Sequence, residues 1–110
     1  MVPKKERLKR DDFTRFFSFG RRVQGTHITL VWTPNKTFHA SVVVPKRVAK
    51  TAVLRNKLRR RIYETLRLAH ISGDISGVCI VLVKPSIKEA TTGQLRDDIH
   101  TLLGRIMKAG

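Results

Sequence analysis

The sequence predicts one α+β domain, a two-layer α/β sandwich, and three observations support this. Ile28, Leu30 and Trp32 alternate with His27, Thr29 and Val31, a period of two that is typical of a strand. Hydrophobic residues recur at helical spacing over residues 51–70, and residues 78–83 are wholly apolar, as in a central strand. The 110 residues suffice for one modest core, and no repeat or linker divides them. Helices alternating with strands favour a sheet covered by helices.

The first predicted element is a short helix that follows a basic arm over residues 1–10. Asp11 or Asp12 is a candidate N-cap, and Gly20 is placed to end the helix. From residue 25 the hydrophobic period changes to two, which predicts a strand.

In that strand Ile28, Leu30 and Trp32 fall on one side, and we expect Trp32 in the core. A Pro-Asn pair then ends the strand. Residues 37–44 are rich in β-branched side chains, and we expect them to form its hairpin partner.

The longest predicted element is a helix over residues 51–70, which follows a basic loop at residues 46–50. One stripe of this helix is apolar and suited to a core, and the surface beside and behind it is mainly cationic. The stripe consists of Leu54, Leu58, Ile62, Thr65, Leu66 and Ala69, and the second surface of Arg55, Asn56, Arg59, Arg60, Tyr63 and Arg67.

The last third of the chain has the pattern of a scaffold. The apolar strand at residues 78–83 is ended by Lys84-Pro85. Thr91 and Gln94 have the spacing of a capping box that opens a final helix. One face of that helix carries Leu95, Ile99, Leu102, Leu103 and Ile106.

The charge of the chain indicates a polyanionic partner. Twenty-three Lys and Arg against eight Asp and Glu give a net charge of +15. Nucleic acid is the leading candidate, and an anionic membrane surface is a distant second. Residues 46–67 carry nine cations, six of them arginine, and Glu64 is their only acid. A solvated surface helix would use more i,i+4 carboxylates, so this surface is expected to bind phosphates.

The sequence offers little support for catalysis by the protein itself. Two adjacent aspartate pairs diverge by about 100° on a helix, which makes them poor acid–base or metal-ion pairs. The four histidines have no carboxylate or cysteine at ligand spacing, and no phosphate loop is present. We therefore expect no catalytic residue, no metal site and no cofactor on the protein.

The single cysteine, Cys79, is expected to be an inert core thiol because it lies in the apolar strand. One cysteine excludes an intrachain disulfide and favours a reducing compartment. No apolar run is long enough to span a membrane, and the N-terminus lacks a signal core. These features predict a cytoplasmic protein without a membrane partner.

The aromatic residues near the N-terminus leave two alternatives open. Phe13, Phe16 and Phe17 have helical spacing and can face a core. They lie among many cations, however, and exposed rings beside a basic strand would provide surfaces on which bases stack.

The arrangement resembles the bacterial ribonuclease P protein component over nearly the whole chain. That family has an N-terminal Leu…Phe-x-x-x-Phe-x-x-Gly pattern and a small-residue–Lys–Lys/Arg loop. It also has an Arg-Asn-x-x-Lys/Arg-Arg-x-x-Arg-Glu signature and a strand that ends in Lys-Pro. The matching residues are Leu8, Phe13, Phe17 and Gly20; Val44, Pro45, Lys46 and Arg47; Arg55, Asn56, Arg59, Arg60 and Glu64; and Lys84 and Pro85. Tyr63 departs from the pattern because it stands where an arginine is usual.

The resemblance implies the order α-β-β-β-α-β-α, with a small mixed sheet and a left-handed β-α-β crossover, an exception to the right-handed rule. It implies a subunit of an endoribonuclease that removes the 5′ leader of precursor tRNA and leaves a 5′-phosphate. A catalytic RNA with bound Mg²⁺ performs the chemistry. The implied partners are that RNA and precursor tRNA.

The resemblance also implies two sets of site residues. The catalytic RNA would contact Arg55, Asn56, Arg59, Arg60, Lys46, Arg47 and Lys50, with Tyr63 and Arg67 beside them. The leader cleft would be lined by Phe13, Phe17, Thr29 and Val31.

The main alternative is a non-catalytic RNA-binding protein of ribosomal type, because the sandwich is shared with a ribosomal protein domain. DNA binding is less expected, since no pair of short helices joined by a tight turn is present. A self-sufficient metal-dependent nuclease would need clustered carboxylates.

Overall fold

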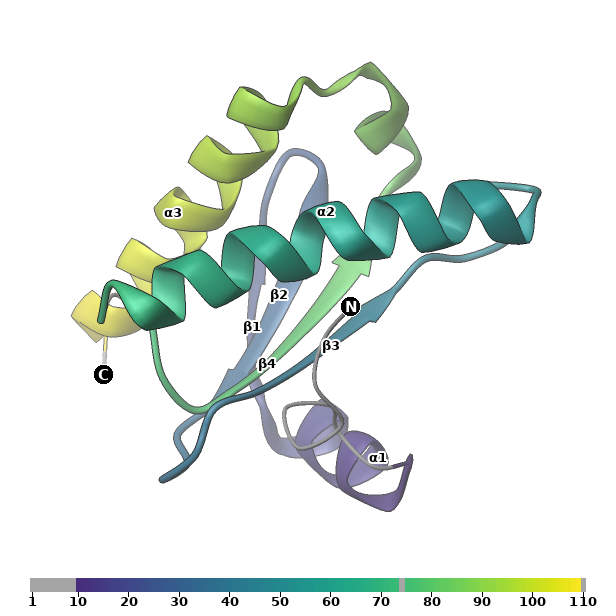
Figure 1. The fold of residues 1–110 in the computed structure, drawn as a ribbon. Coiled ribbons are helices and arrows are strands. Elements are labelled where there is room, and N and C mark those ends of the chain that lie inside the picture. Colours follow the sequence, from purple (N-terminus) through teal and green to yellow (C-terminus); the bar gives the residue numbers. More distant parts are fainter. Residues whose placement is uncertain (1–9, 74, 110) are drawn as a thin grey trace.

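The computed structural model describes residues 10–73 and 75–109, which form a four-stranded sheet with helices on both faces (Figure 1). The order of helices and strands matches the order implied by the resemblance, with one short 3₁₀ helix added. The elements are α1 Arg10–Phe19, β1 Arg21–Gln24, β2 Ile28–Thr33, β3 His39–Val43, α2 Ala52–Ile71, β4 Val78–Val83, η2 Pro85–Glu89 and α3 Thr92–Ala109.

The strand order is β1-β2-β4-β3, so the hairpin expected between residues 28–32 and 37–44 is wrong. β2 pairs with β4 in antiparallel fashion, and β3 lies parallel to β4 on its other side. All but one of the residues of β4 are buried. A strand that is apolar on both faces gains most by burial in the centre, and this places β4 between β2 and β3.

The true hairpin partner of β2 is β1, a strand that the sequence pattern did not predict. Its four residues lie between Gly20 and Gly25 and carry one apolar side chain, Val23. In Figure 1, helix α2 lies in front of the sheet, and the parallel strands β3 and β4 both point upward. The chain leaves β3, passes through α2 and enters β4, which lies to the left of β3. The crossover is therefore left-handed, as the resemblance implied.

The main core lies between the sheet and helices α2 and α3. Ile62, Leu66 and Ala69 of the predicted stripe are buried there, and Leu58 packs at its margin. Leu54 is 50 % exposed, so its predicted core position is wrong. It lies in the first turn of α2, where the helix extends beyond the sheet (Figure 1). Trp32 faces this core as expected but is only partly buried at its margin, and its indole N–H donates to the Ser76 carbonyl.

The starts of α2 and α3 lie where the sequence predicted them, whereas the predicted cap of α1 is wrong. The Thr51 hydroxyl accepts a hydrogen bond from the Leu54 amide and caps α2. Thr91 and Gln94 form the predicted capping box, with reciprocal bonds of 2.9 and 3.1 Å. The helix α1 is already formed at Arg10, so Asp11 and Asp12 lie in its first turn rather than at an N-cap. The rest of the predicted basic arm lies outside the described residues.

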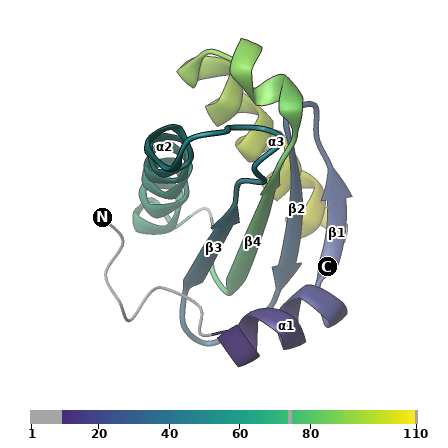
Figure 2. The ribbon, with the colours of Figure 1, turned by 90° about the vertical axis from the view of Figure 1, so that its right-hand side faces the viewer.

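The other face of the sheet carries a smaller apolar cluster under α1 (Figure 2). Val31, Val78 and Ile80 form its buried part, and three of the four phenylalanines of α1, Phe13, Phe16 and Phe17, pack on them. Gly20 allows the close approach, because a Cβ there would lie 2.4 Å from a Val31 methyl group. Thus α1 covers one end of this face, while α2 and α3 occupy the opposite one.

Candidate RNA-binding surfaces

The first candidate surface begins in the loop before α2. Val48 and Ala49 are buried and anchor this loop, whereas Lys46, Arg47 and Lys50 are exposed. The amides of Val48 and Ala49 both donate to the Pro45 carbonyl, which makes a compact turn. The first turn of α2 contains no acid, so the positive end of its dipole adds to these cations. The arrangement concentrates positive potential at one end of α2.

Arg55 holds this loop from inside the helix. Its Nη1 donates to the carbonyls of Ala49 at 3.0 Å and Lys50 at 3.2 Å. Both protons of that nitrogen are therefore engaged within the protein, and Arg55 is only partly exposed. The first arginine of the signature organises the loop as well as adding charge to it.

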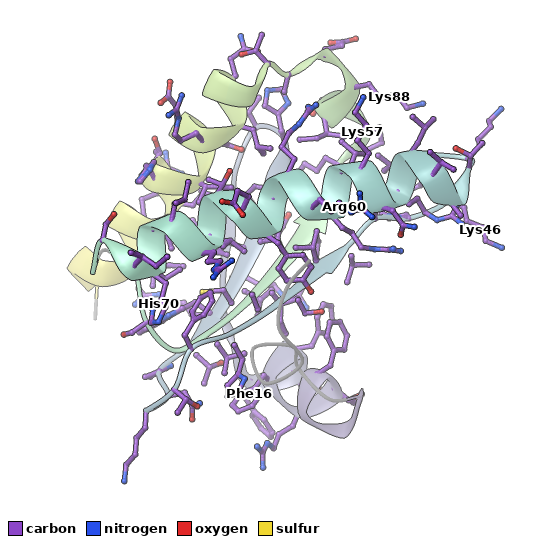
Figure 3. The ribbon with its side chains drawn as sticks, viewed as in Figure 1. Phe16, Lys46, Lys57, Arg60, His70 and Lys88 are labelled. Atoms are coloured by element: carbon purple, nitrogen blue, oxygen red, sulfur yellow. The ribbon has the colours of Figure 1, made fainter. Side chains whose placement is uncertain are left out.

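Asn56 directly follows Arg55, and its side chain pairs with Arg59 on the next turn of α2. The Arg59 Nη1 donates to the Asn56 Oδ1 at 2.6 Å. The bond orients the Asn56 amide group so that its NH₂ donors point away from Arg59. Arg60 is exposed on the outer side of the helix, with Lys57 on the preceding turn (Figure 3). These residues together offer donors and charge suited to phosphate oxygens.

Tyr63 and Arg67 lie further from the loop than the other predicted contacts. Tyr63 packs at the margin of the core, and its hydroxyl lies 3.3 Å from the Ala40 carbonyl. Arg67 is exposed, but it lies about 18 Å along the helix from Arg55 at 1.5 Å per residue. The compact part of the surface therefore runs from Lys46 to Arg60.

The second candidate surface lies on the α1 face of the sheet. The rings of Phe13 and Phe17 stack with centroids 5.6 Å apart, and both are partly exposed. Val31 is 1 % exposed beneath the phenylalanines, so its side chain supports the rings rather than lining the surface. Phe13 and Phe17 therefore serve both as packing residues and as exposed rings. One side of each ring packs on the sheet, and the rest of the ring is accessible.

Three further residues of this face lie on the outer pair of strands. The Arg22 guanidinium lies 4.5 Å from the centre of the Phe17 ring, a cation–π contact. Thr29 is 6 % exposed, and its hydroxyl donates to the Gln24 Oε1 at 3.0 Å. The sequence reasoning named Thr29 but missed Arg22 and Gln24. Gly20 and Gly25 flank this segment, and they are the feature of the sequence that could have indicated a short strand between them.

Three further features concern the thiol, metal-ligating side chains and helix hydropathy. Cys79 is buried, and desolvation raises the pKa of its thiol far above the ordinary value. Within residues 10–73 and 75–109, no three His, Cys, Asp or Glu side chains are grouped to hold a metal ion. No helix in the described part of the chain is long and apolar enough to cross a bilayer.

Two basic surfaces on a small α+β scaffold, one rich in arginine and one aromatic, define a nucleic-acid-binding protein. The Ribonuclease P family model matches residues 2–107. The chain belongs to that family.

Relatives and solved structures support the assignment. The chain is 33 % identical over 96 residues to the ribonuclease P protein component of Thermus oshimai, covering 87 % of this chain and 61 % of the relative. It is 33 % identical over 99 residues to that of Aromatoleum aromaticum, covering 88 % and 82 %. The chain therefore spans less than two thirds of the Thermus protein.

The fold matches solved structures of the same family. The RNase P protein of Staphylococcus aureus superposes with a TM-score of 0.79 at 28 % identity, over 92 % of this chain and 94 % of that one. The Thermotoga maritima protein gives 0.77 at 26 % identity, over 91 % and 96 %.

Proposed function

We propose that this chain is the protein subunit of ribonuclease P, which removes the 5′ leader of precursor tRNA. In this role the exposed surface from Lys46 to Arg60 binds the phosphates of the catalytic RNA. The α1 face of the sheet holds the single-stranded leader. Mg²⁺ bound by the RNA supplies the hydrolytic chemistry, and the complex works in the cytoplasm.

The observation that carries the proposal is the cationic surface at the start of α2. Its exposed lysines and arginines have no carboxylate partner among the described residues. Cations without partners repel one another and destabilise the folded protein, and a polyanion relieves that repulsion. Phosphate contacts also release counterions, which makes this binding strong at low salt.

The leader function is supported by the chemistry of the second surface. Stacked aromatic rings with a guanidinium over one of them can bind unpaired bases and their phosphates. Stacking contributes about 1–3 kcal/mol per base and tolerates different sequences. One surface would thus bind the catalytic RNA while the other draws in the substrate.

The test is cleavage of a 5′-extended precursor tRNA at low Mg²⁺ by a bacterial ribonuclease P RNA, with and without the protein. We expect the protein to stimulate cleavage, and Phe17→Ala to weaken binding of precursor tRNA but not of mature tRNA. Tight RNA binding without stimulation would instead favour the ribosomal-type alternative. Cleavage by the isolated protein would contradict the assignment of chemistry to the RNA.

A further inference from the structure

We propose that Val53 and Leu54 contact an unpaired base of the catalytic RNA and supply a part of its binding that does not depend on salt. This inference rests on the proposed function, because it adds a nonpolar contact within the surface from Lys46 to Arg60. It concerns two residues that precede the signature in the sequence, one of which the helical pattern placed in the core.

Val53 and Leu54 are neighbouring exposed hydrophobic residues in the first turn of α2. Their side chains are 76 % and 50 % exposed, and neither packs on the buried clusters formed by the described residues. Valine is also a weaker helix former than alanine, because its branched side chain loses rotamer freedom in a helix. Neither core packing nor helix propensity accounts for this pair, which offers a nonpolar patch to a partner.

Cations lie on both sides of the Val53–Leu54 patch. Lys57 follows Val53 by one helical turn and Arg60 by two, so these three side chains form one row along α2. Lys57 and Arg60 are exposed on successive turns (Figure 3), and Lys50 is exposed just before the helix. A partner that covers the patch therefore meets positive charge at either end. This favours an anionic partner and disfavours a second copy of this chain, whose net charge is +15.

The nonpolar character of the patch favours an unpaired nucleotide over a paired RNA helix. In a paired helix the bases are stacked on one another, and proteins contact mainly phosphates and 2′-hydroxyl groups, which are polar. An unpaired nucleotide in a loop or bulge exposes the face of its base, and a nonpolar side chain can pack on that face. Val53 and Leu54 are therefore suited to a base whose flanking phosphates lie near Lys50 and Lys57.

The first test uses salt to separate the nonpolar contribution from the ionic one. Binding of the full chain to the catalytic RNA is measured over a range of KCl concentrations, for the wild type and for Val53→Ala with Leu54→Ala. The double variant should bind about tenfold more weakly at every concentration, as expected for the loss of about two buried methylene groups. The slope of log K against log salt should stay the same, because no phosphate contact is removed.

Leu68→Ala with Ile71→Ala is the matched control. These residues are 55 % and 68 % exposed at the other end of α2, so the control removes a similar nonpolar surface away from the cationic loop. It should change the affinity much less. Alanine is a good helix former, and circular dichroism would confirm that both double variants are folded.

Leu54→Cys identifies the nucleotide. Cys79, the single cysteine of the chain, is buried, so the introduced thiol can be labelled selectively with a photocrosslinker. The crosslink should map to an unpaired nucleotide of the catalytic RNA, and removing its base should also weaken binding about tenfold. Base removal combined with Val53→Ala and Leu54→Ala should weaken binding little more than either change alone, because both remove the same contact.

Three results would overturn the inference. The first is wild-type RNA affinity in the folded double variant, and lost binding to phosphatidylglycerol vesicles in that variant would then assign the patch to a membrane surface. The second is a weaker affinity that arises only from a lower salt slope. The third is a crosslink confined to paired RNA or to a second copy of the protein. Failure of the wild-type protein to bind the catalytic RNA would instead count against the proposed function, so the two failures are distinguishable.

Discussion

Arg55 donates from Nη1 to the carbonyl oxygens of Ala49 and Lys50, which ties the start of α2 to the loop before it. The exposed cations of that loop owe their positions to this contact and to the buried Val48 and Ala49. Arg55 thus carries a charge that can bind phosphate and also positions the loop cations that we expect to bind phosphate.

Arg55→Ala should weaken binding of the catalytic RNA by more than the loss of one phosphate contact. The loop carbonyls lose their donor, so Lys46 and Lys50 are no longer held toward the RNA. A double-mutant cycle with Lys46→Ala measures this coupling, and we expect about 0.5–2 kcal/mol. The cycle of Arg59→Ala with Lys46→Ala is the control and should be close to additive. Equal coupling in the two cycles would contradict the positioning role.

Replacing Arg59 and Arg60 together by alanine should lower both the affinity and its salt dependence. Two phosphate contacts release about one counterion each, so the slope of log K against log salt should fall by about 1.5–2. Filter binding to the catalytic RNA over a range of KCl concentrations gives the slope. Arg96→Ala with Arg105→Ala removes the same charge from α3 and should change the slope much less.

Gly77 and Gly73 allow a controlled comparison of the effect of an added Cβ on stability. Both have a positive φ, at +85° and +82° respectively. A Cβ at Gly77 would lie 2.6 Å from the Thr33 carbonyl oxygen, whereas at Gly73 it would meet nothing within 4 Å. Both alanine variants should lose about 1–2 kcal/mol from backbone strain. Gly77→Ala should lose about 1–3 kcal/mol more through overpacking. Urea denaturation measures both, and equal losses would show that the close contact has no effect.

Stability should fall above pH 9 because of Cys79. Burial raises its pKa in the folded protein, whereas the unfolded thiol titrates near the ordinary value of 9.0. Above that pH the unfolded chain loses a proton that the folded chain keeps, so the free energy of unfolding decreases. Cys79→Ala should reduce this slope in urea titrations between pH 8 and 10. A slope that stays the same would assign the pH dependence to other groups.

The local pattern predicted the elements whose partners lie close in sequence. The Thr91–Gln94 capping box opens α3 as predicted, because capping depends on residues three apart. Helix α2 begins within one residue of its predicted start. The strand at residues 78–83 was predicted with its observed bounds, since a run of apolar residues indicates burial on both faces. The cationic surface of α2 followed from helical periodicity alone.

The sequence by itself determined the helix α2, its charge and the buried central strand, because each depends on spacing along the chain. Only the tertiary structure decided that β4 separates β2 from β3, that Leu54 is exposed, and that Arg55 closes its own loop. It also decided that Gln24 meets Thr29 across two strands. Periodicity tells which side of an element is buried, but not which distant segment covers it. That choice depends on how all the buried surfaces fit together at once.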